Sequence, residues 1–203
     1  MMRKYGISTI CTGVLILAAT ACGKPAEAPA PAPPPTTMAP METTVAPEMT
    51  GETLDLLKDA MGWDNYKESD AMSTLAVVTS DKGEALEVTY DLKKGNWLGI
   101  AKPAGKDLSA FKGIKFLYKG EGKTNRLEFK IEDKDGSNFG MVQAANMAEW
   151  TPVEIKFADV PYMWGGDKEL DLKEVRLHWA VSKQANDQGG SGKVTIAGLE
   201  LIP

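Results

Sequence analysis

The chain has 203 residues but only one histidine and two cysteines. A lone histidine excludes zinc sites that need two or three histidines, including HExxH helices. Two cysteines cannot form a four-cysteine metal cluster or a framework of several disulfides. Basic residues are also fewer than acidic ones, 23 against 28, and the net charge of -5 argues against binding the phosphate backbone of nucleic acids. The composition therefore predicts a globular domain outside these metal and nucleic-acid classes.

Catalytic motifs are missing as well. The segment Gly190-Ser191-Gly192 is a flexible turn before a strand, not the strand-to-helix turn that exposes a serine nucleophile. Glycine motifs for binding phosphate are absent, and no pair of carboxylates stands out from the many acidic residues as a glycosidase pair. Asp133 to Asn138 has some acidic residues of a calcium loop but lacks the EF-hand spacing and distal Glu, and a hairpin turn at Asp135-Gly136 explains it. We expect a binding protein, not an enzyme.

The N-terminus has the layout of an export signal. Arg3 and Lys4 precede an almost uncharged apolar run over residues 6–19, and Ala19-Thr20-Ala21 supplies the small residues found before a cleavage site. This layout predicts a secretory signal peptide over residues 1–21. The apolar run is shorter than the ~20 residues that a bilayer span needs, so a retained transmembrane helix is the less favoured alternative.

Cys22 follows the predicted cleavage site directly. Residues 17–22, Leu-Ala-Ala-Thr-Ala-Cys, resemble the lipobox of bacterial lipoproteins, although that family usually has Leu where Ala19 stands. The resemblance implies that Cys22 is lipidated, that the protein is anchored in the bacterial cell envelope, and that Gly23 directs it to the outer membrane if the source is Gram-negative. Lipoproteins carry three acyl chains, more than the two signals that stable anchoring takes. Ordinary cleavage at the same bond is the alternative.

Residues 22–50 have the composition of a disordered linker. They contain eight of the chain's 12 prolines, interleaved with Ala, Thr and Met, and no aromatic residue. Such a segment cannot bury enough apolar surface to offset the entropy of ordering, so we expect an extended tether. A proline-rich ligand for a partner domain is the alternative, but the Pro33-Pro34-Pro35 run has no adjacent basic anchor.

From residue 51 the sequence changes to a globular pattern. Residues 51–203 hold 14 of the 15 aromatic residues, and apolar side chains alternate with polar ones in seven or eight short segments separated by glycine-rich turns. This period of two is typical of half-buried strands and predicts an antiparallel β-sandwich or jelly roll. A helix is expected only over 52–61. The residues expected to face the core are Leu86, Val88, Tyr90, Leu92, Ile114, Phe116, Tyr118, Leu127, Phe129, Ile131, Val153, Ile155, Phe157, Val175, Leu177, Trp179, Val181, Val194, Ile196, Leu199 and Leu201.

Several segments resemble the galactose-binding-like jelly rolls, which include carbohydrate-binding modules and complex-I intermediate-associated proteins. They are Asp107-Leu108-Ser109, the strand that ends before Asp135-Gly136, Trp150-Thr151-Pro152-Val153-Glu154-Ile155-Lys156-Phe157 and Leu170-Asp171-Leu172, in this order. The resemblance implies a jelly-roll fold for roughly 75–203 and a buried Trp150. It also implies a structural calcium held by an acid near the closing strand, but Ala197 occupies that position, so no cofactor is expected.

Aromatic side chains in loops are candidates for contacts with a ligand. The apolar face of a sugar ring stacks on indole or phenol, while its hydroxyls bond to polar groups. Trp97 lies beside Gly95-Asn96, and Tyr162 and Trp164 precede two glycines. We predict ligand contact at these three side chains, with packing over the end of the sandwich as the alternative. Trp63 and Tyr66 are expected to cover a sheet edge, and no ligand contact is predicted for them.

Four polar residues are predicted to share a sheet face. His178 and Arg176 point away from the core because they alternate with Leu177 and Trp179, and Glu128 and Lys130 do so on another strand. If the two strands belong to one sheet, these side chains form a face that can hydrogen-bond to hydroxyl groups. An ordinary solvated face is the alternative.

The function hypothesis combines these features. It is a lipid-anchored extracytoplasmic jelly-roll domain on a Pro/Ala tether that binds a glycan without catalysis. The alternative is a structural or assembly lipoprotein that docks a protein partner of the cell envelope and binds no sugar.

Overall fold

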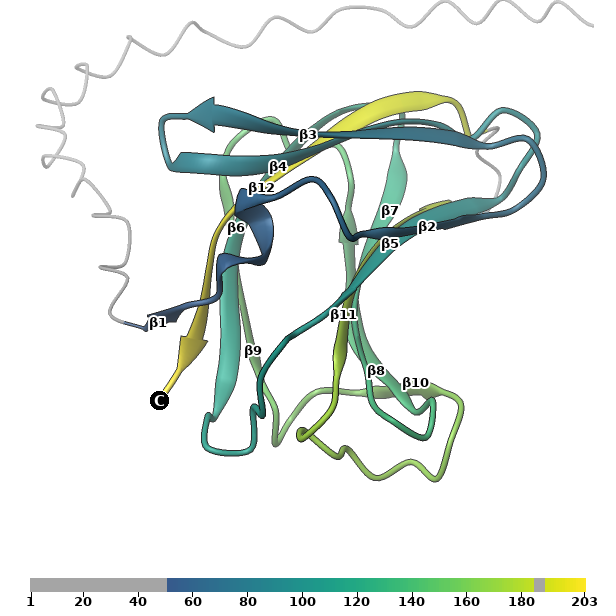
Figure 1. Cartoon of the computed structure of the whole chain (residues 1–203). Helices are drawn as coiled ribbons and strands as arrows, with labels where there is room; N and C mark the ends of the chain where they lie inside the picture. The colour runs from purple at the N-terminus through teal and green to yellow at the C-terminus, as the bar shows by residue number, and fades with distance from the viewer. Residues whose placement is uncertain (1–50, 185–188) are drawn as a thin grey trace, which may run out of the picture. The chain divides into compact units, whose positions relative to one another are not determined.

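The computed structural model of the chain describes residues 51–184 and 189–203. These residues form two antiparallel six-stranded sheets that pack face to face, as Figure 1 shows. The predicted β-sandwich is confirmed. The predicted signal peptide, Cys22 and the tether lie outside the described residues. No helix in the described ranges is long and apolar enough to span a bilayer.

The first sheet, sheet A, has the order β3-β4-β12-β6-β9, with β1 paired to the far half of β12. Its edges are therefore β3 and β9. Its strands are β1 (Glu52–Thr53), β3 (Met72–Ser80), β4 (Gly83–Asp91), β6 (Gly113–Gly122), β9 (Thr151–Lys156) and β12 (Ser191–Ile202).

The second sheet, sheet B, has the order β10-β8-β7-β11-β5-β2. Its central pair, β7 and β11, are far apart in the chain, so long connections bring them together. Its strands are β2 (Asp64–Lys67), β5 (Trp97–Pro103), β7 (Asn125–Glu132), β8 (Asn138–Ala144), β10 (Tyr162–Trp164) and β11 (Arg176–Lys183).

The core lies between the sheets and consists of the residues that the alternation pattern selects. All 21 residues expected to face inward are buried. An aromatic cluster joins the sheets at the centre: Phe116 of β6 lies 5.1 Å from Phe129 of β7 and 5.7 Å from Trp179 of β11, measured between ring centroids. Large apolar side chains thus cover the inner faces of both sheets. Only the outer faces are open to contacts with other molecules.

The hairpin turn predicted at Asp135-Gly136 is confirmed between β7 and β8. The Gly136 amide donates to the Asp133 carbonyl at 3.1 Å, and Gly136 has φ 87°, a conformation that glycine adopts without strain. The backbone amides of Ser137 and Asp167 donate hydrogen bonds to the two oxygens of the Asp135 carboxylate. These bonds give the acidic side chain its partners within the turn.

The helix predicted over 52–61 is wrong. Only a short 3-10 helix forms, η1 (Asp55–Lys58), and Asp59 after it is already extended. Leu54 and Leu57 are buried as expected, but Met61 is 78% exposed. A spacing of three residues fits one 3-10 turn as well as an α-helix, and the pattern does not continue because the chain must straighten to enter β2.

The expectation that Trp150 is a core residue is also wrong. Its indole Nε1 donates to Asp81 at 2.8 Å, and the Lys119 ammonium lies 4.7 Å from the ring centroid. Val153 and Ile155 face the core, so the period of two places Trp150 on the outward side. The ring therefore covers the outer surface of sheet A.

Candidate functional site

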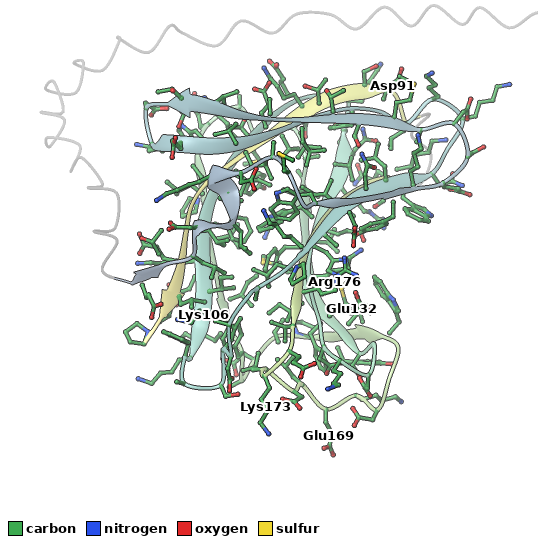
Figure 2. All side chains as sticks on the ribbon, in the orientation of Figure 1. Asp91, Lys106, Glu132, Glu169, Lys173 and Arg176 are labelled. Carbon is green, nitrogen blue, oxygen red and sulfur yellow. The ribbon has the colours of Figure 1, made fainter. Side chains whose placement is uncertain are left out.

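The register of β7 and β11 brings the four predicted polar residues onto the outer face of sheet B. His178 is directly opposite Lys130, Arg176 is opposite Glu132, and Ala180 is opposite Glu128. The two strands are neighbours in one sheet, which was the condition for a shared polar face. Figure 2 shows Arg176 and Glu132 side by side on the side of sheet B that faces away from sheet A.

This face is not an ordinary solvated one, because two of its polar side chains are buried. Lys130 is 5% exposed and His178 is 8% exposed. The Lys130 ammonium lies 3.4 Å from a Glu128 carboxylate oxygen, and the other oxygen of that carboxylate accepts a short hydrogen bond from the Ser182 hydroxyl. Buried charges of this kind need partners, and here each is held in one position by its neighbour.

Arg176 forms the next ion pair along the face. Its guanidinium donates to the carboxylate of Asp64 on β2, so the pair crosses β5 from the centre of the sheet to its edge. Lys130 with Glu128 and Arg176 with Asp64 balance positive against negative charge. The face is therefore strongly polar without a large excess of either sign.

His178 links the polar row to an aromatic ring. The Tyr66 hydroxyl lies 3.0 Å from His178 Nδ1, and His178 Nε2 lies 2.7 Å from Glu132 Oε2, although its N–H is poorly aligned with that oxygen. Burial lowers the pKa of His178 to about 4; Glu132 opposes this shift, while Lys130 and Arg176 add to it. The imidazole is therefore neutral near pH 7, and with its own proton on Nε2 it accepts a hydrogen bond from the Tyr66 hydroxyl at Nδ1.

The phenol of Tyr66 stays protonated in this setting. Its pKa is raised, first by burial and then by the carboxylates of Glu128 and Glu132. The hydroxyl can therefore act as a donor to His178 across the whole physiological pH range.

Aromatic rings flank the polar row on both sides. The Lys130 ammonium lies 6.0 Å from the Tyr66 ring and 4.9 Å from the Trp164 ring, so it sits between them. Trp97 extends the first side, with its centroid 5.8 Å from that of Tyr66. Trp97 and Trp164 are 39% and 46% exposed, which leaves large apolar surfaces open beside a polar floor.

Gly99 on β5 makes room for the Tyr66 ring. It lies opposite Tyr66 in the β2–β5 ladder, and a Cβ at this position would lie 2.6 Å from the Tyr66 Cζ and hydroxyl oxygen. The ring thus lies directly across the strand, where any larger residue would displace it.

Six of the seven predicted ligand-contact residues lie on this face: Trp97, Trp164, His178, Arg176, Glu128 and Lys130. Tyr162 lies apart from them. Its ring packs edge-on against the inward-facing Phe139 at 5.7 Å, and its hydroxyl donates to the Gly165 carbonyl. A register shift in the β8–β10 pair separates Tyr162 from Trp164, so the two rings lie on different sides of the sheet.

Tyr66 is the main residue that sequence reasoning missed. It belongs to a strand of four residues, too short to show a period, and its role depends on contact with His178, which is 112 positions away. Glu132, Asp64 and Ser182 were also missed. Glu132 could have been found by continuing the outward alternation of Glu128 and Lys130 by two residues.

Two hollows elsewhere on the described residues lack aromatic walls. One of about 430 Å³ lies on the outer face of sheet A beside Glu87, Lys119 and Lys193. Another of about 720 Å³ continues beyond Glu132 and Arg176 at the end of sheet B. No aromatic residue lines either one, so neither offers a stacking surface. Within the described residues no group of three or more His, Cys, Asp or Glu side chains could hold a metal ion.

Comparison with known proteins assigns this chain to a family. Residues 30–203 match the model of the carbohydrate binding domain, family 11. The chain belongs to this family. Family 11 domains bind carbohydrate without catalysis, so the protein is a non-catalytic binding domain and not an enzyme. No curated protein matches the chain.

Solved structures with the same fold are distant in sequence from this family 11 domain. A family 11 carbohydrate-binding module from Clostridium thermocellum, in complex with a β-1,3-1,4-mixed-linked tetrasaccharide, is 20% identical with TM-score 0.60, over 75% of this chain and 94% of that one. An exo-β-agarase is 15% identical with TM-score 0.54, over 76% of this chain and 25% of that one. TmCBM61 in complex with β-1,4-galactotriose is 14% identical with TM-score 0.50, over 75% of this chain and 97% of that one.

Proposed function

We propose that the outer face of sheet B binds a glycan chain, which lies along the polar row between the Tyr66 and Trp97 rings on one side and Trp164 on the other. The observation that carries this proposal is the arrangement of exposed rings around a row of buried, fixed hydrogen-bonding groups. A pyranose ring has apolar faces, which can stack on the aromatic side chains. Its edges carry hydroxyl groups, which can hydrogen-bond to the polar row between them.

The charge balance of the face favours an uncharged glycan. Lys130 is neutralised by Glu128 and Arg176 by Asp64, so a carboxylate or sulfate on the sugar would compete with an existing partner. The solved family 11 module holds a β-1,3-1,4-mixed-linked tetrasaccharide. A soluble β-1,3-1,4-linked polysaccharide is therefore the first ligand to test.

The binding test compares aromatic residues on the two outer faces. In affinity electrophoresis with the polysaccharide in the gel, Trp164→Ala and Tyr66→Ala should each weaken retardation by roughly tenfold or more, the usual scale for a central aromatic contact. Trp150→Ala is the matched control, because it removes an indole from the outer surface of sheet A.

Two results would count against the glycan face. One is an equal loss of retardation in Trp150→Ala and Trp164→Ala. The other is no retardation on any of a panel of neutral glycans together with co-purification of an envelope protein, which would favour the alternative of a structural or assembly lipoprotein.

We propose further that Cys22 carries a lipid that holds the protein at the bacterial envelope, at the outer membrane in a Gram-negative source. The support is the resemblance of residues 17–22 to a lipobox and the proline-rich segment after it, which could act as a spacer for the binding domain. Cys22→Ser should move the protein from the membrane fraction to the soluble fraction of cells and abolish labelling with radioactive palmitate. Unchanged partitioning and labelling would refute the anchor.

A further inference from the structure

Four strands end the two strand orders, apart from the two-residue β1, and three of the four carry features that discourage pairing with another strand. Edge strand β2 has charged residues at both ends, Asp64 and Lys67; β10 has only three residues; and β9 contains Pro152 besides two charged residues. Charges, short length and proline are the usual protections of an open edge. The fourth edge, β3, is different.

Strand β3 is a long, unprotected edge. It runs for nine residues, Met72–Ser80, without a charge, a proline or a glycine, and five of its nine residues are β-branched or leucine. It pairs with β4 along its whole length, and none of the strands in residues 51–184 and 189–203 pairs with its other side. Figure 1 shows it at the periphery of sheet A. Such a strand is a template for another chain.

The ladder register identifies which backbone groups of β3 are free. The Leu92 amide donates to the Gly190 carbonyl, so the even-numbered residues of β4 bond to β12 and the odd-numbered ones bond to β3. The partners of those odd-numbered residues are the even-numbered residues of β3. The odd-numbered residues, Ser73, Leu75, Val77 and Thr79, therefore point their N–H and C=O groups outward, and no backbone partner for them exists among the described residues.

We propose that β3 pairs antiparallel with β3 of a second copy of this chain, about a two-fold axis at Ala76. This register makes Leu75 face Val77 of the second copy, and Ser73 face Thr79. All four outward-pointing residues of each strand then fall in hydrogen-bonded pairs. Both sheets A join into one continuous sheet.

The side chains on both faces suit this symmetric pairing. Leu75 and Val77 are half-buried at the rim of the core, and the same two residues of the second copy would close the rim over them. On the other face Ala76 lies at the axis and Thr74 comes opposite Val78 of the second copy, so no like charges meet along the paired strands. A copy of the same strand therefore supplies apolar complementarity.

The expected dimer is weak by itself but useful for binding a polymer. One strand pair is a small interface, so association should depend on protein concentration. The two-fold axis is perpendicular to the joined sheet, which puts both sheets B on the same side. If the proposed function holds, two glycan faces would then engage one polysaccharide chain or surface together and gain avidity.

The test uses cysteine cross-linking of the full chain. Ala76 is exposed and would sit at the non-hydrogen-bonded centre of the pair, where Cα atoms are about 4.5 Å apart, within the range that a disulfide bridges. Ala76→Cys under mild oxidation should give a covalent dimer on a non-reducing gel. Thr74→Cys is the matched control, because it is exposed on the same face but about 13 Å from its own copy in this register.

Further variants separate the dimer from other results. The unchanged chain, which keeps Cys11 and Cys22, shows any background from those thiols. In sedimentation equilibrium, Ala76→Lys should abolish self-association by placing like charges at the axis.

The proposal fails if Ala76→Cys cross-links no better than Thr74→Cys, or if Ala76→Cys is trapped with a different protein instead of its own copy. Loss of glycan binding has no bearing on these readouts. Failure of the glycan face and failure of the dimer can therefore be told apart.

Discussion

Single residues on the outer face of sheet B hold one another in position before any ligand arrives. Lys130 is fixed between two rings and a carboxylate, and His178 is held between Tyr66 and Glu132. Because these side chains have already lost their rotational freedom on folding, the glycan binding proposed for this face would cost less ordering entropy than binding on a solvated surface. The burial that orders the face also shifts the titration of its histidine.

The first prediction concerns the pH dependence of stability. The folded pKa of His178, about 4, lies below its ordinary value of 6.5, so between these values the unfolded chain binds a proton that the folded chain does not. The free energy of unfolding should fall as the pH drops from about 6.5 to 4, by up to about 3 kcal/mol from this group. Urea unfolding at a series of pH values measures the effect.

His178→Gln is the control for this titration, since His178 is the only histidine in the chain. The variant should show a flatter profile between pH 4 and 6.5. Asp133, whose pKa burial raises, acts in the opposite direction at the acid end. A profile of the same steepness in His178→Gln and the unchanged chain would show that the histidine is not the cause.

At the scale of elements, the outer face of sheet B depends on strands that are too short to show an alternating pattern in the sequence. β2 has four residues, yet its register against β5 places Tyr66 over Gly99 and beside Trp97. β10 has three residues and positions Trp164 over Lys130. The long strands β7 and β11 supply the polar floor, and the short edge strands supply the rings around it.

The second prediction is that Gly99→Ala weakens glycan binding although it replaces no side chain that faces the ligand. The added methyl would lie 2.6 Å from Tyr66 Cζ and force the ring off the strand. We expect a loss of affinity comparable with that of Tyr66→Ala, roughly tenfold, by isothermal titration calorimetry. Ala101→Gly, on the same face of β5, should bind normally. Normal binding by Gly99→Ala would show that Tyr66 needs no fixed position.

At the scale of the whole molecule, one aromatic cluster ties the two sheets together. Phe129 lies 5.1 Å from both Phe116 and Trp179, and Trp63 packs edge-on against Trp179 at 5.6 Å. β7 and β11 thus carry the polar floor on one side and the centre of the core on the other. Stability of the sandwich and the geometry of the face are therefore linked through the same two strands.

The third prediction follows from this cluster. Phe129→Ala should lower the free energy of unfolding by about 3–5 kcal/mol, because it removes a fully packed ring and leaves a cavity between the sheets. Met61→Ala, at an exposed position, should change it by less than about 0.5 kcal/mol. Chemical denaturation of the two variants provides the measurement, and similar midpoints would contradict a core assembled around Phe129.

Much of the fold could be predicted because strand alternation is local information. The inward residues of β4, β6, β7, β9, β11 and β12 were identified correctly, and so was the shared face of Glu128, Lys130, Arg176 and His178. The errors at Trp150 and Met61 arose where a family pattern or a short helical spacing was preferred to the period of two. The wider face could not be predicted in full because Tyr66 belongs to a strand of only four residues, too short to show a period.

The sequence by itself determined which side of each long strand faces the core, since side chains alternate by covalent geometry whatever the neighbouring strands are. Only the tertiary structure decided which strands are neighbours: β7 beside β11, β2 beside β5, and β3 alone at an edge. Those pairings set Tyr66 against His178 and Trp164 over Lys130, and they leave the amides of β3 open. Their physical cause is that burial of the inner faces is shared by residues far apart in the chain, so strand order depends on the packing of the whole core.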